Sequence, residues 1–230
     1  MSKVDLRLDW CSYEAAKFAV EHWHYSRTMP VSKRVHVGVW EDKNFIGAVI
    51  FSWGANPNLS KAFGLTMTEC TELVRVALTD HNSSVSRIVS IALKMFKAQS
   101  PGVRLIVSYA DPREGHVGSI YQAGNWVFTG ETSPKFDFQV GDQILQRRSY
   151  TGVNFGGGRR RPPPGAVKVK SPPKYRYLYP LDDAMRAQIE PLRKPYPKKV
   201  IHASEVSDSG TPAHQPEGAM QCDPDALIVP

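Results

Sequence analysis

Residues 106–130 read IVSYADPREGHVGSIYQAGNWVFTG, and this stretch sets the fold of the chain around it. An apolar strand, Leu105–Val107, leads into a polar loop that holds Asp111 and His116. A short helix is predicted over Ser119–Ala123, because a glycine follows it at a favoured helix-ending position. Reactive side chains at a strand end, beside a helix N-terminus, are a common way for α/β enzymes to place their chemistry. The stretch therefore predicts a catalytic loop, although a purely structural β–α–β unit with a polar loop has the same pattern.

The remaining segments predict alternating helices and strands around this unit. The region 85–99 is the most regular, because Ile88, Ala92 and Phe96 recur at helical spacing. The order predicts a mixed α/β domain. The expected elements are a helix at 13–23, strands at 35–41, 45–53 and 69–78, a helix at 85–99, strands at 105–107 and 126–129 around the short helix, and a last strand pair within 136–150.

Charge is unevenly distributed along the chain, whose net charge is +7. Residues 1–150 carry +3, residues 151–199 carry +9 and residues 200–230 carry −5. The density of positive charge in residues 151–199 suits the binding of a polyanion.

The basic segment begins with NFGGGRRRPPPGAVKVKSPPK at 154–174. Its glycines, arginines and prolines predict a hinged, extended arm, although a flexible linker with incidental charge has the same composition. Three parts are expected: a catalytic domain at 1–152, a basic arm with a short helical extension at 153–199, and an acidic, disordered tail at 200–230.

Composition also excludes several classes of protein. No apolar run reaches the length of a membrane span, and the first residues lack the basic-then-apolar pattern of a signal peptide. The cysteines, Cys11, Cys70 and Cys222, are far apart and form no CxxC pair. This spacing indicates reduced thiols rather than a disulfide framework or a zinc ribbon. We therefore expect a cytoplasmic protein.

The turn between the strand at 69–78 and the helix at 85–99 is a second candidate site. Backbone N–H groups at a helix N-terminus attract anions. Ser83, Ser84, Ser86 and Arg87 add further donors around this turn. A diphosphate would fit there, and an ordinary serine-capped helix is the alternative.

The order of elements resembles the GNAT superfamily of acetyl-CoA-dependent N-acyltransferases. In that family the fourth strand and the following helix N-terminus hold the CoA pyrophosphate, and the matching segments here are Glu72–Ala77 and His81–Arg87. The turn departs from the family's glycine-rich Q/R-x-x-G-x-G/A loop. The resemblance implies a GNAT-like fold, with a mostly antiparallel sheet flanked by helices, and a basic C-terminal extension. The implied cofactor-binding residues are Arg75, Val76, Asn82, Ser83, Ser84, Ser86 and Arg87, of which Asn82, Ser83 and Ser84 stand where glycines are expected.

Four segments carry a closer resemblance: HWHYS at 22–26, ELVRVAL at 72–78, the serine-rich start of the helix at 85–99, and SYADPREGHVGSIYQAGNWVFTG at 108–130. Read together, they are similar to the Mom DNA-modification proteins of Mu-like phages. Each is weak alone, but the combination is specific. Members of that family convert adenine in phage DNA to N6-carbamoylmethyladenine, which protects the DNA from host restriction enzymes. The resemblance implies the same activity here, on double-stranded DNA in the bacterial host cytoplasm.

The resemblance also implies roles for single residues. Asp111 would accept a hydrogen bond, or the proton, from the N6 amino group of an adenine flipped out of the duplex. Tyr25 would stack on or hydrogen-bond to the base, and His24 or His116 would move a proton near neutral pH. Tyr121 matches the GNAT tyrosine that protonates the leaving thiolate. The predicted catalytic set is Asp111, Tyr25, His24, Tyr121, Ser108 and His116.

The product constrains the donor. Its new bond joins N6 to the methylene of a CH2–CO–NH2 group, so plain acetyl transfer would give the wrong compound. The implied donor is acetyl-CoA or another activated two-carbon compound, small or carrier-bound, with a glycyl donor among the options. Two histidines and a carboxylate would also suit a non-haem iron ion. The candidates for such ligands are His22, His24, His36, Asp111 and His116, whose spacing leaves the metal open.

Phosphate contacts are expected from basic side chains. Two other functions fit the sequence: a GNAT-type acyltransferase that acts on RNA or another amine, and a non-catalytic DNA-binding protein. An N6-adenine methyltransferase does not fit, because Asp111-Pro112 lacks the second proline and the aromatic residue of a D-P-P-Y motif. The oligomeric state stays open. The predicted DNA-binding set is Arg159, Arg160, Arg161, Lys168, Lys170, Arg113, Lys33 and Arg34.

Overall fold

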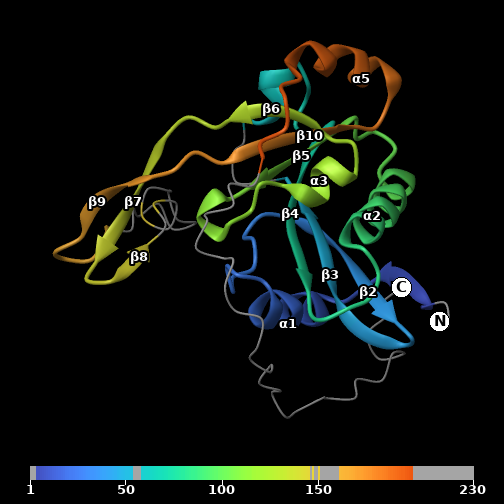
Figure 1. Ribbon diagram of the computed structural model, residues 1–230, viewed down its shortest axis with the longest axis horizontal. Helices are drawn as coiled ribbons and strands as arrows, with labels where there is room; N and C mark the ends of the chain where they lie inside the picture. Colours follow the sequence, from blue (N-terminus) through green and yellow to red (C-terminus); the bar gives the residue numbers. More distant parts are fainter. Residues whose placement is uncertain (1–3, 54–57, 146, 148–149, 151–160, 199–230) are drawn as a thin grey trace.

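A computed structural model describes residues 4–53, 58–145, 147, 150 and 161–198 (Figure 1). Its main body is a seven-stranded sheet in the order β1-β2-β3-β4-β5-β10-β6. Neighbouring strands are antiparallel except β4 and β5, which run parallel. The predicted mixed sheet, mostly antiparallel and flanked by helices, is confirmed. The strands are β1 Leu6–Trp10, β2 Arg34–Glu41, β3 Asn44–Ser52, β4 Cys70–Leu78, β5 Leu105–Ala110, β6 Val127–Glu131 and β10 Tyr175–Pro180.

Three of the helices begin and end where the sequence predicts. These are α1 (Tyr13–Trp23), α2 (Val85–Gln99) and α3 (Ser119–Ala123). The Ser12 hydroxyl caps α1, accepting a hydrogen bond from the Ala15 N–H at 3.2 Å. The predicted short helix near residue 181 is present as α5, and β1 is an additional strand. The other helical segments are α5 Asp183–Ile189, η1 Ser60–Phe63, η2 Pro112–Glu114 and η3 Glu190–Leu192.

Helices cover both faces of the sheet. The apolar face of α2, with Ile88 and Phe96, packs with Tyr121 of α3 on one face. On the other face α1 packs on β3 and β4, and α5 packs on β5 and β10. Within the described residues no helix is long and apolar enough to cross a membrane.

The prediction that the last strands lie within 136–150 is wrong, because β9 and β10 follow them. β10 inserts between β5 and β6, where Tyr177 pairs with Ser108 on one side and Phe128 on the other. The Tyr177 side chain is fully buried. Prolines on both sides hide this strand in the sequence, but its alternating tyrosines point into the core.

A smaller sheet projects from the main one. Its order is β8-β7-β9, and Figure 1 shows β7 and β9 running outward together as a two-stranded ribbon. Paired residues share a face, so Lys168 and Lys170 lie on the same side as Phe138 and Phe136. The three strands are β7 Lys135–Val140, β8 Gln143–Leu145 and β9 Val167–Ser171.

The parallel pair β4 and β5 separates after a short contact. Pairing joins only Cys70–Glu72 with Leu105–Val107. Beyond it the register between β3 and β4 shifts near Val74, which indicates a bulge of the kind that re-aims side chains beside functional sites. The opening between the two strands positions the candidate site.

Candidate active site

Residues from two distant parts of the chain meet near the ends of α1 and β5. His24 and Tyr25 follow α1, while Asp111 and His116 follow β5. The Tyr25 ring centroid lies 4.2 Å from that of His24 and 5.6 Å from that of His116. Burial, followed by the nearby Asp111 charge, raises the pKa of Tyr25. Four of the six predicted catalytic residues are therefore neighbours.

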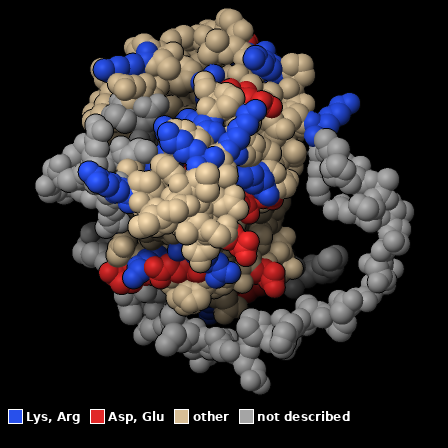
Figure 2. Space-filling view, turned by 90° about the vertical axis from the view of Figure 1, so that its left-hand side faces the viewer, with Lys and Arg blue, Asp and Glu red and all other residues tan. Residues whose placement is uncertain are grey.

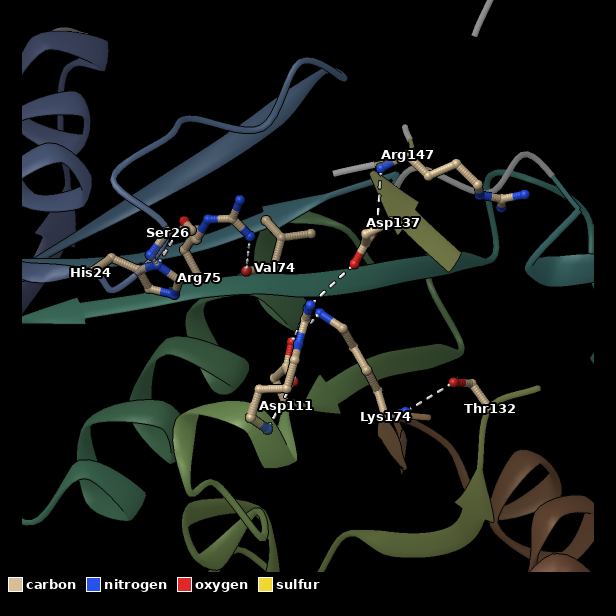
Figure 3. Close-up of polar contacts among 10 residues, drawn as sticks. His24, Ser26, Val74, Arg75, Asp111, Thr132, Asp137, Arg147 and Lys174 are labelled. Atoms are coloured by element: carbon tan, nitrogen blue, oxygen red, sulfur yellow. Dashed lines mark hydrogen bonds and ion pairs between the residues drawn. The ribbon is translucent and has the colours of Figure 1, made fainter. Parts of the chain in front are cut away.

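Asp111 is the centre of an ionic cluster (Figure 3). Its Oδ1 accepts from the Arg113 backbone N–H at 3.1 Å and from Arg113 Nε at 3.2 Å. Its Oδ2 lies 3.0 Å from Arg113 Nη2 and 2.8 Å from Lys174 Nζ. A carboxylate offers about four lone-pair sites. These four contacts therefore use the whole accepting capacity of Asp111.

The same contacts fix the charge of Asp111. Burial alone would raise the pKa of this carboxyl, whose side chain is 2% exposed. Hydrogen bonds from Arg113 and Lys174 outweigh burial and lower the pKa to about 2. Asp111 is ionised at neutral pH and is a weak base.

Arg113 links the loop after β5 to the projecting ribbon. Its Nη1 lies 3.1 Å from Oδ2 of the buried Asp137 on β7, whose Oδ1 accepts from the Arg147 N–H at 3.1 Å. The guanidinium, predicted to contact DNA, is thus held between two carboxylates. These contacts support a structural role for Arg113 inside the protein.

His24 is buried and neutral. The Ser26 backbone N–H donates to His24 Nδ1 at 3.0 Å, and the Ser26 hydroxyl lies 2.8 Å from the same nitrogen. Because a backbone N–H can only donate, Nδ1 is the acceptor, and the proton of the neutral ring is on Nε2. Burial, then the charges of Arg75, His116 and Lys174, lowers the pKa of His24 to about 3.

Ser108 and Tyr121 lie in the opening between β4 and β5. The Ser108 hydroxyl is 2.8 Å from the Leu73 carbonyl and 2.7 Å from the Tyr121 hydroxyl. A carbonyl only accepts, so the single Ser108 proton goes to Leu73 and the Ser108 oxygen accepts a hydrogen bond from the Tyr121 hydroxyl. Burial raises the pKa of Tyr121 to about 12. Tyr121 therefore holds its proton at neutral pH and can act as an acid.

Arg75 faces His24 rather than the turn before α2. Its Nη1 donates to the Val74 carbonyl at 2.7 Å (Figure 3). Its Nη2 donates to the Thr28 carbonyl at 3.1 Å. The neighbouring Val76 packs against the core beneath α2. Arg75 was predicted to bind donor phosphate, and its position instead joins it to the His24 cluster.

The turn before α2 already has an internal partner. The Glu41 carboxylate accepts from the Asn82 N–H at 2.9 Å and from the Ser83 N–H at 2.6 Å. The Ser86 hydroxyl lies 3.5 Å from the Ser84 hydroxyl, and the Arg87 N–H donates to the Ser84 carbonyl at 3.0 Å. The predicted phosphate cradle is thus occupied in part by the chain itself.

The other predicted DNA contacts lie on different surfaces. Lys168 and Lys170 are exposed on β9, and Lys168 Nζ lies 4.9 Å from the Phe136 ring centroid. Figure 2 shows Lys and Arg gathered on the side of the molecule toward which this ribbon extends. Lys33 stands over Trp53, and Arg34 stands over Tyr13. Arg161 is exposed, while Arg159 and Arg160 lie outside the described residues.

The five candidate iron ligands do not form a metal-binding group, although His24, Asp111 and His116 lie in the same part of the site. Among the residues that the structure describes, no group of three or more His, Cys, Asp or Glu could hold a metal ion. His22 Nδ1 lies 2.8 Å from the Phe18 carbonyl, and the His36 ring is beside Tyr13. The donor set does not fit a two-histidine, one-carboxylate centre.

Two residues of the site are missing from the sequence-based set, Lys174 and Glu41. Each is a charged residue at the point where an apolar strand begins or ends. This position is the only signal for them in the sequence. Their partners come from distant segments.

The molecule is a mixed α/β protein with its candidate site where the two parallel strands of the sheet part. Similar solved structures include the N-acyl amino acid synthase FeeM from uncultured soil microbes, with 10% identity and a TM-score of 0.45 over 81% of this chain and 95% of that one. A Bacillus subtilis acetyltransferase in complex with CoA has 14% identity and a TM-score of 0.44 over 78% and 99%. The spermidine/spermine N-acetyltransferase SpeG of Vibrio cholerae has 12% identity and a TM-score of 0.41 over 81% and 95%.

The chain belongs to the Mom protein family, whose model matches residues 5–198. It is 28% identical over 204 residues to methylcarbamoylase Mom of Escherichia phage Mu, and the match covers 84% of each chain. The family resemblance carried by the four sequence segments is confirmed.

Proposed function

We propose that this protein is a DNA-modifying transferase that attaches a carbamoylmethyl group to N6 of adenine. Its membership of the Mom family and its similarity to a phage Mu protein named methylcarbamoylase support the proposal. The observation that carries it is the meeting of His24 and Tyr25 with Asp111 and His116. The modified DNA would be protected from host restriction enzymes, and the protein would act in the host cytoplasm.

Tyr25 would receive the adenine. A base must leave the duplex before its N6 can react, and flipped bases are commonly held by aromatic stacking. The Tyr25 residue is 46% exposed, yet its ring contacts the rings of His24 and His116. The ring is therefore both positioned and accessible.

The two histidines would have different tasks. Bond formation at N6 releases one proton. Neutral His24 carries its proton on Nε2 and would donate a hydrogen bond, whereas the exposed His116 would accept the proton. Asp111 would accept from N6 only in exchange for one of its present donors. Lys174, whose side chain is 36% exposed, is the donor that can leave.

Tyr121 would supply a proton to the group that leaves the methylene carbon of an activated two-carbon donor as that carbon bonds to N6. Its hydrogen bond to Ser108 keeps the hydroxyl oriented within the opening between β4 and β5. An acyl-CoA type of donor is the class that the GNAT resemblance suggests. At the turn before α2 the N–H groups of Asn82 and Ser83 already bond to Glu41, so we derive no step through CoA.

Mass spectrometry of nucleosides from cells that express the protein tests the proposal. We expect a modified deoxyadenosine with wild type and none with Tyr25→Ala. A modified nucleoside in RNA alone would favour an RNA-directed acyltransferase. Unchanged nucleosides in both DNA and RNA would favour a non-catalytic DNA-binding protein.

A further inference from the structure

Glu41, the last residue of β2, places its carboxylate at the turn that leads into α2. The residue is 5% exposed. Its two oxygens accept from consecutive backbone N–H groups, those of Asn82 at 2.9 Å and Ser83 at 2.6 Å. The turn therefore binds an anion already, and the anion is part of the chain.

Glu41 brings a negative charge close to the start of α2, although its two donors, the N–H groups of Asn82 and Ser83, precede the N-cap residue Ser84. The helix has no acidic residue in its first turn, and Ser84 makes no side-chain capping bond within this fully described helix start. A helix N-terminus is stabilised by negative charge and by acceptors for its free N–H groups. Burial opposes ionisation of Glu41, but the Asn82 and Ser83 donors outweigh it and hold its pKa below the usual range.

We infer that Glu41 closes the turn before α2 to phosphate, and that the two-carbon donor of this protein is not held by a diphosphate there. The two N–H groups cannot serve Glu41 and a phosphate at once. A diphosphate at the turn would also place its charge against a buried carboxylate, which is unfavourable. The side chains that stand in place of the family's glycines leave less room for a phosphate to reach the backbone of the turn. They are those of Asn82, Ser83 and Ser84. The inference rests on the proposed function for the existence of a two-carbon donor, and it holds whichever base is modified.

The donor that fits is an activated two-carbon compound, small or carrier-bound, that is held without a nucleotide diphosphate on α2. Ser108 and Tyr121 are buried polar groups that lie where β4 and β5 separate. The predicted phosphate ligand Arg75 also faces this side, toward His24.

Amide NMR of the wild-type protein gives the direct test. CoA and inorganic pyrophosphate are titrated separately into labelled protein, and the Asn82 and Ser83 amide signals are followed. We expect these two signals to stay in place at millimolar ligand. A saturable shift of both with CoA would overturn the inference, even if DNA modification itself were established.

Opening the turn gives the complementary test. Glu41→Ala should let pyrophosphate bind, so pyrophosphate should raise the melting temperature of this variant and leave that of wild type unchanged. Glu131→Ala, which removes an exposed carboxylate elsewhere, is the matched control. If Glu41→Ala folds and pyrophosphate still fails to stabilise it, Glu41 is not what closes the turn. If the variant does not fold, the wild-type titration decides.

Discussion

Asp111 is the side chain on which the charges of the site converge. Asp111→Asn keeps its shape but removes the charge that holds Arg113 and Lys174. We expect loss of modified adenine and a free energy of unfolding lower by about 2 kcal/mol, measured by urea denaturation. Nucleoside analysis showing near-normal modification in a folded variant would contradict the catalytic role.

The stabilisation by Asp111 should depend on pH in a defined direction. The pKa of the folded carboxyl is about 2, below its unfolded value, so its contribution is complete above about pH 4 and is lost as the pH falls toward 2. The difference in stability between wild type and Asp111→Asn should therefore shrink across this window. A constant difference would mean that the pKa of Asp111 is not lowered.

His24 should make the free energy of unfolding depend on pH at higher pH values than Asp111 does. Its folded pKa is about 3, so the unfolded chain binds more protons below about pH 6.5, and stability should fall as the pH drops through that value. His24→Asn keeps an acceptor near the Ser26 N–H and cannot titrate. We expect a flatter stability profile for this variant between about pH 6.5 and pH 5, as measured by urea denaturation. A profile parallel to that of wild type would show that His24 is not buried in its neutral form.

The β9 strand carries two of the predicted DNA contacts, Lys168 and Lys170. Lys168→Ala with Lys170→Ala should weaken binding to duplexes of any sequence and lower the slope of log affinity against log salt by about 0.9 for each phosphate that is no longer neutralised. The reaction rate at saturating DNA should change little, because both lysines lie outside the cluster around Asp111. Fluorescence anisotropy at several salt concentrations measures the slope.

A matched pair of lysines controls for total charge. Lys61→Ala with Lys94→Ala removes two exposed cations from η1 and α2, away from the ribbon. An equal decrease of the slope in both double variants would show that the ribbon has no special role. Binding would then depend on net charge, or on the arginines at 159–161, whose predicted role stays untested.

Elements differ in how well the sequence predicted them. The bounds of α2 followed from its repeating apolar residues, and those of α1 from Ser12 and the helical spacing after it, because both signals are local. The sequence did not predict β10, because a central strand is defined by the strands that it pairs with rather than by a local pattern. Its partners, β5 and β6, precede it by a long stretch of chain.

The site was predictable only where its residues lie in one segment. The loop with Asp111 and His116, and the pair His24 and Tyr25, were visible as polar or aromatic groups at element ends. Glu41 and Lys174 were not, since each acts on a group that only the assembled sheet brings near. Such long-range ion pairs leave no periodic trace in the sequence.

The stability of the whole molecule depends on β10, and substitutions of Tyr177 in this strand test that dependence. Its fully buried ring packs against Tyr121 and Phe128, and its hydroxyl donates to the Val117 carbonyl at 2.6 Å. Tyr177→Ala should lower the free energy of unfolding by about 3–5 kcal/mol, and Tyr177→Phe by about 1 kcal/mol. Equal, small decreases in urea denaturation would mean that the core does not rely on this ring.

The late position of β10 also sets the order in which the protein can mature on the ribosome. β5 and β6 are synthesised first, and the edges that they offer to β10 must wait without their partner. Lys174 arrives with β10, so the ionic cluster around Asp111 closes last. Nascent chains halted before residue 175 should be cut readily by protease, whereas chains extended beyond residue 198 should resist. The sheet and the site are thus completed together, once β10 has been synthesised.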